Sequence, residues 1–242
     1  IEAVGADVAG YEVGDRVFGV VTKPYLGDGG FADYVTVATA VGLAKLPASI
    51  EFADAGVLGL AGVAAISAFD KANIQPGQVV LIAGATGGVG SQALQLAVKA
   101  GATVIATAVT AEEKQLVTDL GAAETVDYNE PIAPAVHANY AAGVDVVLHF
   151  AGDAGAVLAA ARKGGTFVST LIMSAEQLPS PDVTVLGVYA NPDEATLNRV
   201  ATNHAKGVTR VRIERTYSLD EVPDALAAFA TGTLGKLAIT VA

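Results

Sequence analysis

The sequence predicts an α/β fold, with a doubly wound parallel sheet and a small antiparallel β unit at the start of the chain. Residues 78–102 read as a buried strand, a glycine-dense turn and a helix. Strand-like and helix-like segments then alternate as far as residue 189, which is typical of parallel strands joined by right-handed helical crossovers. Residues 1–37 instead contain short apolar runs separated by glycines, a pattern of short antiparallel strands.

The composition is that of a globular chain without nucleic-acid or membrane partners. Its 242 residues are 52% hydrophobic and 16% charged, enough to bury the core of one large or two intergrown domains. Cysteine is absent, which excludes disulfides, thiolate catalysis and cysteine-ligated zinc. The net charge of −11 opposes binding to a phosphate backbone. The longest uncharged run, residues 72–98, contains proline, glycines and polar residues, so it does not resemble a membrane span, and a cytoplasmic location is expected.

The glycine-dense turn has the pattern of a dinucleotide site. After the apolar run Val79–Ile82, residues 85–90 read ATGGVG and fit G-x-G-x-x-G with the first glycine replaced by alanine. Gly87 would let the backbone approach a pyrophosphate, and Gly90 would let the helix pack closely on the strand. Free N–H groups at the helix start would face the phosphates. The alternative is an ordinary tight turn, but the strand before it and a helix closed by Gly101 favour a Rossmann dinucleotide-binding unit.

The remaining elements follow from apolar periodicity and from glycine and proline breaks. Short strands are predicted at residues 1–4, 16–21 and 31–37. Ser49 is a plausible N-cap for the Ala-rich helical segments at residues 53–71. Further strands are predicted at residues 103–107, 124–128, 144–150, 166–170, 183–189, 208–217 and 236–241. Further helices are predicted at residues 111–120, 156–162, 192–206 and 219–231.

Four motifs in order resemble a known family. They are Gly14-Asp15-Arg16-Val17, Gly29-Gly30-Phe31-Ala32-Asp33-Tyr34-Val35, Ala85-Thr86-Gly87-Gly88-Val89-Gly90 and Gly235-Lys236. Together they are similar to the zinc-free quinone oxidoreductase branch of the medium-chain dehydrogenase/reductase superfamily, and the resemblance runs along the whole chain. It implies a GroES-like catalytic domain, from residues 1–62 and 191–242, around a Rossmann NADP-binding domain at residues 63–190.

The resemblance also implies that the catalytic domain is incomplete. In the family a substantial segment precedes the position that matches Ile1 and supplies catalytic-domain strands and one wall of the substrate cleft. The sequence is therefore expected to be either a piece of a longer protein or a shortened form. Both alternatives stay open at this point.

The residues after the second Rossmann strand bear on the choice of cofactor. NAD-preferring sites place an acid about 20 residues after the glycines, whereas Thr107–Thr110 contains none, which favours NADP. Glu113 stands where the family commonly has a lysine, with Lys114 one residue later. Tyr128 matches a tyrosine that flanks the adenosine 2′-phosphate in related reductases.

The predicted cofactor-binding residues follow from the glycine turn and from the resemblance. They are Ala85, Thr86, Gly87, Gly88, Val89, Gly90, Thr107, Thr110, Lys114, Tyr128, Ala151, Gly152, Ser169, Thr170 and Leu171. The last five end two strands, where family members meet the nicotinamide. Ser169 and Thr170 are equally well explained as a routine strand end, and Thr110 and Lys114 as solvated residues at a helix start.

No metal site is predicted, because the three histidines are dispersed and cysteine is absent. His149 interrupts an apolar strand, so we expect it to be a buried core residue with satisfied hydrogen bonds rather than a ligand or catalytic group.

The resemblance implies metal-free transfer of hydride from NADPH to a quinone or an α,β-unsaturated carbonyl. The alternative is a non-catalytic NADP-binding module left by loss of the front segment. The sequence identifies no catalytic residue; Tyr25 and Tyr34 only place hydroxyl groups in the catalytic domain. A homodimer is expected through the apolar strand Val183–Tyr189, since an exposed edge of that kind invites pairing.

Overall fold

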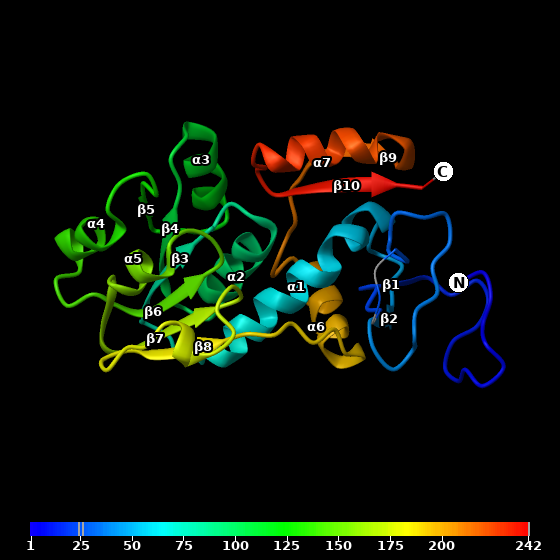
Figure 1. Ribbon diagram of the computed structural model, residues 1–242, viewed down its shortest axis with the longest axis horizontal. Helices are drawn as coiled ribbons and strands as arrows, with labels where there is room; N and C mark the ends of the chain where they lie inside the picture. The colour runs from blue at the N-terminus through cyan, green and yellow to red at the C-terminus, as the bar shows by residue number, and fades with distance from the viewer. Residues whose placement is uncertain (24, 26, 242) are drawn as a thin grey trace. The chain divides into compact units, whose positions relative to one another are not determined.

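The chain divides into two compact units in the computed structural model, which describes residues 1–23, 25 and 27–241 (Figure 1). Unit 1 combines Ile1–Val63 with Asn191–Ala242, and unit 2 is Ala64–Ala190. Pro24, Leu26 and Ala242 belong to the predicted catalytic domain, residues 1–62 and 191–242, but lie outside the described residues.

Unit 2 is built on a sheet of six parallel strands in the order β5-β4-β3-β6-β7-β8. The strands are β3 (Val79–Ala83), β4 (Thr103–Thr107), β5 (Glu124–Val126), β6 (Val144–His149), β7 (Ala161–Ser169) and β8 (Thr184–Gly187). The strand order reverses between β3 and β6, and ligands of open parallel sheets bind at such a switch point, outside the carboxyl ends of the strands. The predicted doubly wound α/β class is confirmed.

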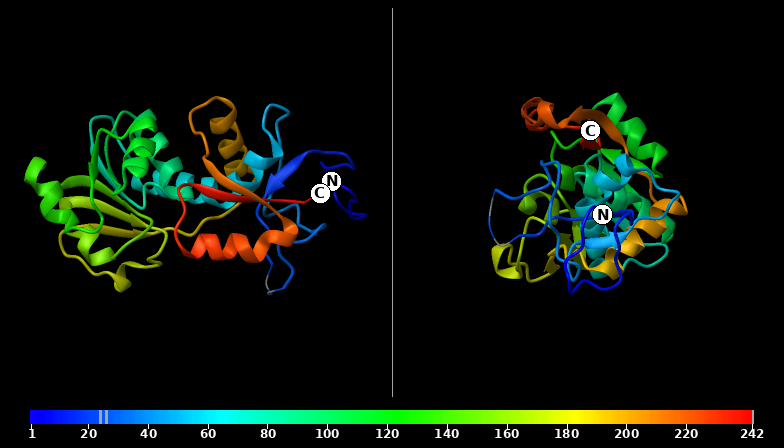
Figure 2. Two further views of the ribbon diagram at one scale, coloured as in Figure 1. Left: turned by 90° about the horizontal axis from the view of Figure 1, so that it is seen from above. Right: turned by 90° about the vertical axis from the view of Figure 1, so that its right-hand side faces the viewer.

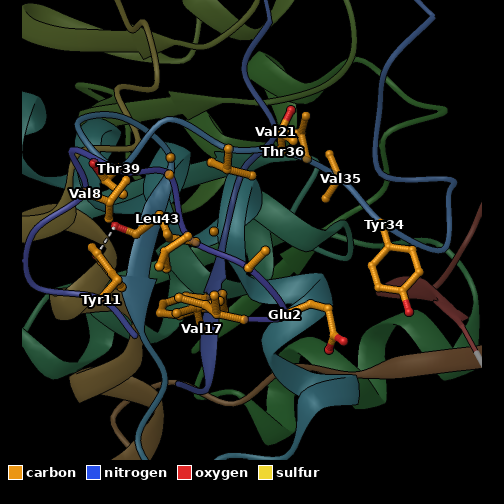
Figure 3. Close-up of a pocket in the computed structure, with 18 of the residues that line it drawn as sticks. Glu2, Val8, Tyr11, Val17, Val21, Tyr34, Val35, Thr36, Thr39 and Leu43 are labelled. Carbon is orange, nitrogen blue, oxygen red and sulfur yellow. Dashed lines mark hydrogen bonds between the residues drawn. The ribbon is translucent and has the colours of Figure 1, made fainter. Parts of the chain in front are cut away.

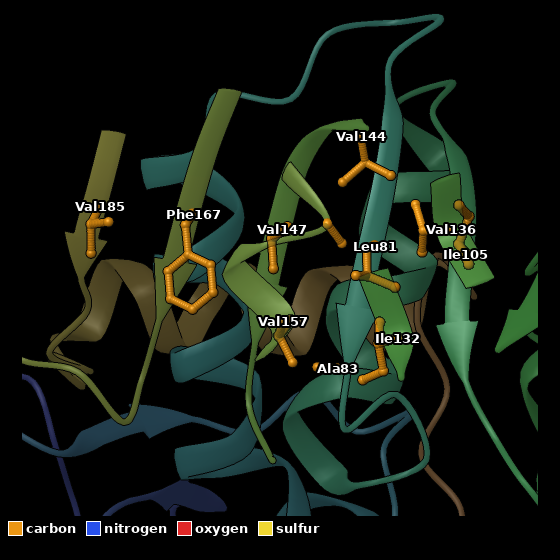
Figure 4. Packing of buried hydrophobic residues seen from close by; sticks show 11 residues of the cluster. Leu81, Ala83, Ile105, Ile132, Val136, Val144, Val147, Val157, Phe167 and Val185 are labelled. Carbon is orange, nitrogen blue, oxygen red and sulfur yellow. The ribbon is translucent and has the colours of Figure 1, made fainter. Parts of the chain in front are cut away.

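Helices cover both faces of this sheet. They are α2 (Gly88–Lys99), α3 (Ala111–Asp119), α4 (Ile132–Asn139) and α5 (Ala154–Leu158), with a short 3₁₀ helix, η1 (Ala175–Gln177). On one face, Ile132 of α4 and Val157 of α5 pack over Leu81 and Phe167 of the strands (Figure 4). α2 contacts β3 and β4, and its buried residues include Leu94. Each fully buried side chain of this size contributes about 1.5–3 kcal/mol relative to an exposed one.

Unit 1 contains two separate strand pairs. β1 (Val17–Gly19) pairs antiparallel with β2 (Leu43–Lys45), and β9 (Ile213–Ser218) pairs parallel with β10 (Lys236–Thr240). α7 (Val222–Ala230), preceded by the 3₁₀ helix η2 (Leu219–Glu221), runs along the second pair (Figure 2). The further helices are α6 (Glu194–Ala205) and α1 (Phe52–Ala72), whose last nine residues belong to unit 2.

Two glycines allow α1 to lie close to its neighbours in unit 1. A Cβ at Gly59 would overlap the carbonyl oxygen of Gly19 in β1. A Cβ at Gly62 would come within 2.6 Å of Val200 Cγ1 in α6. Within the described residues, α1 is the single helix long and apolar enough to cross a membrane, but 61% of its apolar window is buried inside the protein. A core helix has the same properties, so this is weak support for a membrane span.

Two predicted N-terminal strands are wrong. Residues 1–4 and 31–37 are irregular, and Phe31 and Tyr34 are 60% and 75% exposed. A strand requires a partner that accepts and donates its backbone hydrogen bonds, and neither segment has one among the described residues. Apolar runs alone therefore overpredicted strands in this part of the chain. The predicted strand at residues 208–217 similarly starts only at Ile213, where pairing with β10 begins.

Two helices of unit 2 differ from the prediction. α4 is absent from the predicted elements. Pro131 is its N-cap and Pro134 lies in its first turn, where a missing N–H costs no intrahelical bond. The helix predicted at residues 156–162 ends at Leu158, since Asp153 caps it earlier and Ala161 already pairs with Val144 in the sheet.

Candidate cofactor-binding site

The loop between β3 and α2 is shaped by two glycines that no other residue can replace without displacement. Gly84 has a φ of +81° and a Cβ there would lie 2.9 Å from Ala151 Cβ. At Gly90 a Cβ would overlap the Gly84 carbonyl oxygen and lie 2.8 Å from Ala85 Cα. The helix therefore begins directly against the end of the strand, the close packing that the sequence predicted for Gly90.

Gly87 differs from both because its surroundings are open. It has a φ of −76° and ψ of 171°, and a Cβ would meet only the Gly84 oxygen, at 3.5 Å. It is the N-cap of α2, and no side chain caps this helix end. The partial positive charge of a helix N-terminus and its free N–H groups form a suitable site for an anion. Gly87, Gly88 and Val89 are half-buried, so this end of the helix is accessible.

Thr107, at the end of β4, is hydrogen-bonded to the backbone of the β3–α2 loop. Its Oγ1 accepts a hydrogen bond from Gly84 N at 3.0 Å, and the residue is 2% exposed. The hydroxyl is thus engaged by the loop backbone, so Thr107 holds the loop in place rather than presenting its side chain to solvent.

The turn after β4 carries a carboxylate. Thr110 caps α3, with Oγ1 accepting from Glu113 N at 3.1 Å, and Glu113 Oε2 accepts from Val109 N at 2.7 Å and Thr110 N at 2.9 Å. The hydroxyl of Tyr128 donates to Glu113 Oε1 at 3.0 Å. This is a capping box, with a tyrosine added from the next strand end.

The hydrogen bonds keep Glu113 ionised. Burial alone would raise the pKa of Glu113, but the N–H groups of Thr110 and Val109 and the Tyr128 hydroxyl outweigh it and hold the pKa below its ordinary value. The same carboxylate raises the pKa of Tyr128. Lys114 is exposed and Tyr128 is 49% exposed, so this turn presents an anion, a cation and a phenol ring together.

The ends of β6 and β7 are joined by a buried polar chain. His149, 1% exposed, lies with Nε2 at 3.1 Å from the Gly152 carbonyl oxygen and Nδ1 at 2.9 Å from Ser169 Oγ. Ser169 Oγ also accepts from Leu171 N and Ile172 N, at 2.9 and 3.0 Å. The prediction of a buried, satisfied histidine is confirmed. Burial lowers the pKa of His149, opposed by the bond to Gly152 and the charge of Asp153.

The predicted site residues therefore fall at one edge of unit 2. Because all six strands are parallel, the β3–α2 loop and the ends of β4, β6 and β7 meet at the carboxyl edge of the sheet. Ala151 and Gly152 are exposed there, and Leu171 is 55% exposed. The side chains of Ser169 and Thr107 instead point inward. Gly84, Glu113 and His149 were not among the predicted cofactor-binding residues, although Glu113 was noted beside Lys114 and His149 was expected in the core. The Thr-x-x-Glu spacing indicates the capping role of Glu113, whereas nothing local connects His149 to Ser169.

Unit 1 contains a separate cavity of about 840 Å³ (Figure 3). Its lining is largely aliphatic, with Val17, Val35 and Leu43 among the side chains, and Tyr34 stands at one side. The Tyr25 hydroxyl, by contrast, donates to Asp28 Oδ2 at 3.1 Å. An aliphatic lining of this kind suits an apolar ligand. No group of three or more His, Asp or Glu residues that could hold a metal occurs among residues 1–23, 25 and 27–241.

Comparisons with known proteins agree with this geometry. Residues 88–205 match the family model described as zinc-binding dehydrogenase. The quinone oxidoreductase of Sus scrofa is 36% identical over 131 residues, 54% of this chain and 38% of that protein. The solved quinone oxidoreductase of Coxiella burnetii superimposes with a TM-score of 0.86 at 27% identity, over 99% of this chain and 76% of that one.

These matches together support a quinone oxidoreductase-like member of the medium-chain dehydrogenase/reductase superfamily. Members of this superfamily bind nicotinamide dinucleotides, which agrees with the loop and edge described above. The structure of CurK enoyl reductase is also similar, with a TM-score of 0.85 and 25% identity over 100% of this chain and 76% of that one. The segment matched in the Sus scrofa protein is well under two thirds of its length, so activity, substrate and partners of this oxidoreductase-like chain are proposals.

Proposed function

We propose that this chain transfers hydride from NADPH to a quinone or an α,β-unsaturated carbonyl, without a catalytic metal. One observation carries the proposal: Gly84 and Gly90 bring the strand and helix together, and Gly87 leaves open space beside a helix end that no side chain caps. That arrangement fits a pyrophosphate. Similarity to proteins named quinone oxidoreductase and enoyl reductase supports the substrate class.

Bound NADPH would supply the reactive hydride, and the chain would supply binding and orientation. The backbone N–H groups of Gly88 and Val89 would hold the pyrophosphate, because Gly87 N already donates to Gly84 O at 3.2 Å. Lys114 and Tyr128 would hold the adenosine end, and the strand ends at residues 151–152 and 169–171 would hold the nicotinamide end. The absence of cysteine supports the metal-free part of the proposal, since the zinc sites most common in proteins use thiolates.

The preference for NADPH rests on a balance of charges at the adenosine end. Lys114 would attract a 2′-phosphate, and the strand end at residues 107–110 carries no acid. Glu113 opposes the phosphate, but three donors already engage its two oxygens. A carboxylate engaged in this way is a poor additional partner for the two ribose hydroxyls that an NAD-type acid would bind, and this favours NADPH.

The experiment that tests the proposal combines two measurements on the parent chain. Paired fluorescence titrations with NADPH and NADH measure cofactor binding, and oxidation of NADPH with 1,4-benzoquinone measures turnover. Tighter binding of NADPH together with turnover supports the full proposal. Binding without turnover supports the alternative of a non-catalytic NADP-binding module, and equal or tighter binding of NADH contradicts the assigned cofactor.

We also propose a homodimer formed through β8. This strand lies at the edge of the sheet, but it is four residues long and part of its edge is engaged, because Lys71 Nζ donates to the Gly187 carbonyl at 2.6 Å. Val188 N donates inward to Ser169 O. Since backbone groups alternate along a strand, Leu186 also donates inward to β7, and Val185 offers its N–H outward to a second copy.

A further inference from the structure

The polar chain at the ends of β6 and β7 has one direction of hydrogen bonding. The Gly152 carbonyl oxygen can only accept, so His149 Nε2 carries a proton and donates to it at 3.1 Å. In the neutral ring Nδ1 is then an acceptor, and the Ser169 hydroxyl donates to it at 2.9 Å. The two lone pairs of Ser169 Oγ accept from Leu171 N and Ile172 N. Every donor and acceptor in this chain of bonds is used.

The bonded groups hold the two turns that form the exposed edge of the site. His149 and Ser169 face each other in register on adjacent strands, and both are at most 1% exposed. The imidazole stacks on Phe167 with ring centroids 5.3 Å apart, so ring packing also restricts its orientation. From this buried pair, one bond fixes the turn at Gly152 and two fix the turn at residues 171–172.

The first of these turns also contacts the phosphate loop. Phe150 N donates to Ala83 O at 3.0 Å. Ala151 lies close against Gly84, because a Cβ on Gly84 would lie 3.1 Å from Ala151 N. This contact places the turn at residues 150–152 directly beside the phosphate loop. The loop is also held by the bond from Gly84 N to Thr107 Oγ1, so loss of the buried pair should displace the two turns and leave the loop in place.

We propose that His149 and Ser169 are positioning residues for the nicotinamide end of the cofactor, holding the turns at residues 150–152 and 170–172 in the arrangement that orients the dihydronicotinamide for hydride transfer. This inference rests on the function proposed above. Neither residue touches the reacting atoms in this role, because both side chains are buried beneath the exposed backbone of the turns. A fixed orientation of the donor lowers the entropic part of the barrier.

The test compares two ligands that differ only at the nicotinamide end. Ser169→Ala removes the hydroxyl and leaves three partners unbonded, and His149→Phe retains ring stacking but removes both bonds. His149→Asn is the conservative variant, since its amide can keep an acceptor near Nδ1. Val144→Ala, at the opposite end of β6 and fully buried, is the control for loss of stability alone. Each variant is titrated with NADPH and with 2′-phospho-ADP-ribose, and single-turnover hydride transfer to 1,4-benzoquinone is measured.

We expect Ser169→Ala and His149→Phe to weaken NADPH binding or slow hydride transfer by about tenfold or more. The affinity for 2′-phospho-ADP-ribose should stay within about twofold of the parent value, because this ligand has no nicotinamide end to lose contacts. Loss of one whole hydrogen bond would instead lower the affinity by about tenfold. His149→Asn should recover part of the loss, and Val144→Ala should change melting temperature without changing the ratio of the two affinities.

Three results would overturn the inference. If both ligands weaken together, or if only the melting temperature falls, the pair is merely structural, while the proposed function stands. If the parent binds 2′-phospho-ADP-ribose and NADPH equally and transfers no hydride, no nicotinamide end is oriented and both proposals fail. A parent that prefers NADH contradicts the assigned cofactor and not the positioning role; the variants are then titrated with NADH and ADP-ribose, and equal weakening of both ligands overturns the inference.

Discussion

Substituting Gly87 and Gly90 of the phosphate loop one at a time should separate the effect on stability from the effect on cofactor binding. At Gly90 an alanine Cβ would overlap the Gly84 carbonyl oxygen and lie 2.8 Å from Ala85 Cα, whereas ordinary contacts begin at 3.4 Å. The start of α2 must therefore move away from the backbone of Ala85 by at least the difference between these distances, 3.4 − 2.8 = 0.6 Å. At Gly87 the same atom would meet its nearest neighbour at 3.5 Å, an ordinary contact, with φ already at −76°.

The expected magnitudes follow from this difference. Overpacking of a rigid site costs about 1–3 kcal/mol, and each kcal/mol lowers the melting temperature of a protein of this size by about 2–4 °C. We therefore expect Gly90→Ala to melt about 2–12 °C below the parent without cofactor. Gly87→Ala loses only an N-cap preference, worth up to about 1 kcal/mol. Its methyl group would nevertheless point into the open space before the helix, and NADPH affinity should fall at least about tenfold.

Thermal unfolding of the cofactor-free protein and NADPH fluorescence titration measure the two effects. Both variants should bind NADPH poorly, but only Gly90→Ala should be strongly destabilised. The reasoning is refuted if Gly90→Ala melts with the parent, because the close approach of helix and strand would then be absent. It is equally refuted if Gly87→Ala binds NADPH with parental affinity, because no phosphate would then pass that position.

Further predictions concern charge, pH, metal and assembly. Glu113→Gln should raise the ratio of NADPH affinity to NADH affinity by about tenfold, and Lys114→Ala should lower it, as charge-assisted contacts are worth about 1.5–3 kcal/mol. If neither variant changes this ratio, the adenosine end does not bind at this turn. The lowered pKa of folded His149, against 6.5 when unperturbed, means that the neutral ring stabilises the fold fully above pH 6.5 and that this contribution is lost as pH falls below it. Urea unfolding from pH 7 to 5 should therefore show a steeper loss for the parent than for His149→Phe, and equal slopes would contradict it. NADPH oxidation should survive exhaustive chelation; loss that zinc restores would disprove the metal-free proposal. Light scattering should show a dimer for the parent and for Val185→Ala but a monomer for Val185→Pro, which lacks the outward N–H; a monomeric parent would rule out edge pairing.

Much of unit 2 could be predicted because its signals are local. The apolar run at β3, the glycines and the periodic residues of α2 occur within 25 consecutive positions, 78–102, and each residue type is required by the conformation of its own segment. Alternation of strands and helices then predicted the parallel sheet, since few other topologies accommodate it. The residues that follow each strand were placed at one edge by the same rule, and the structure has them there.

The sequence by itself determined the strands and helices around the glycine loop, whereas only the tertiary structure decided which polar groups act on one another. Thr107 meets Gly84 across 23 positions, and His149 meets Ser169 across 20. Those pairs depend on the register between neighbouring strands, which is set by the packing of both sheet faces rather than by any local pattern. The same reason explains the overpredicted strands at residues 1–4 and 31–37: an apolar run favours an extended conformation, but a strand exists only where another segment supplies its hydrogen bonds.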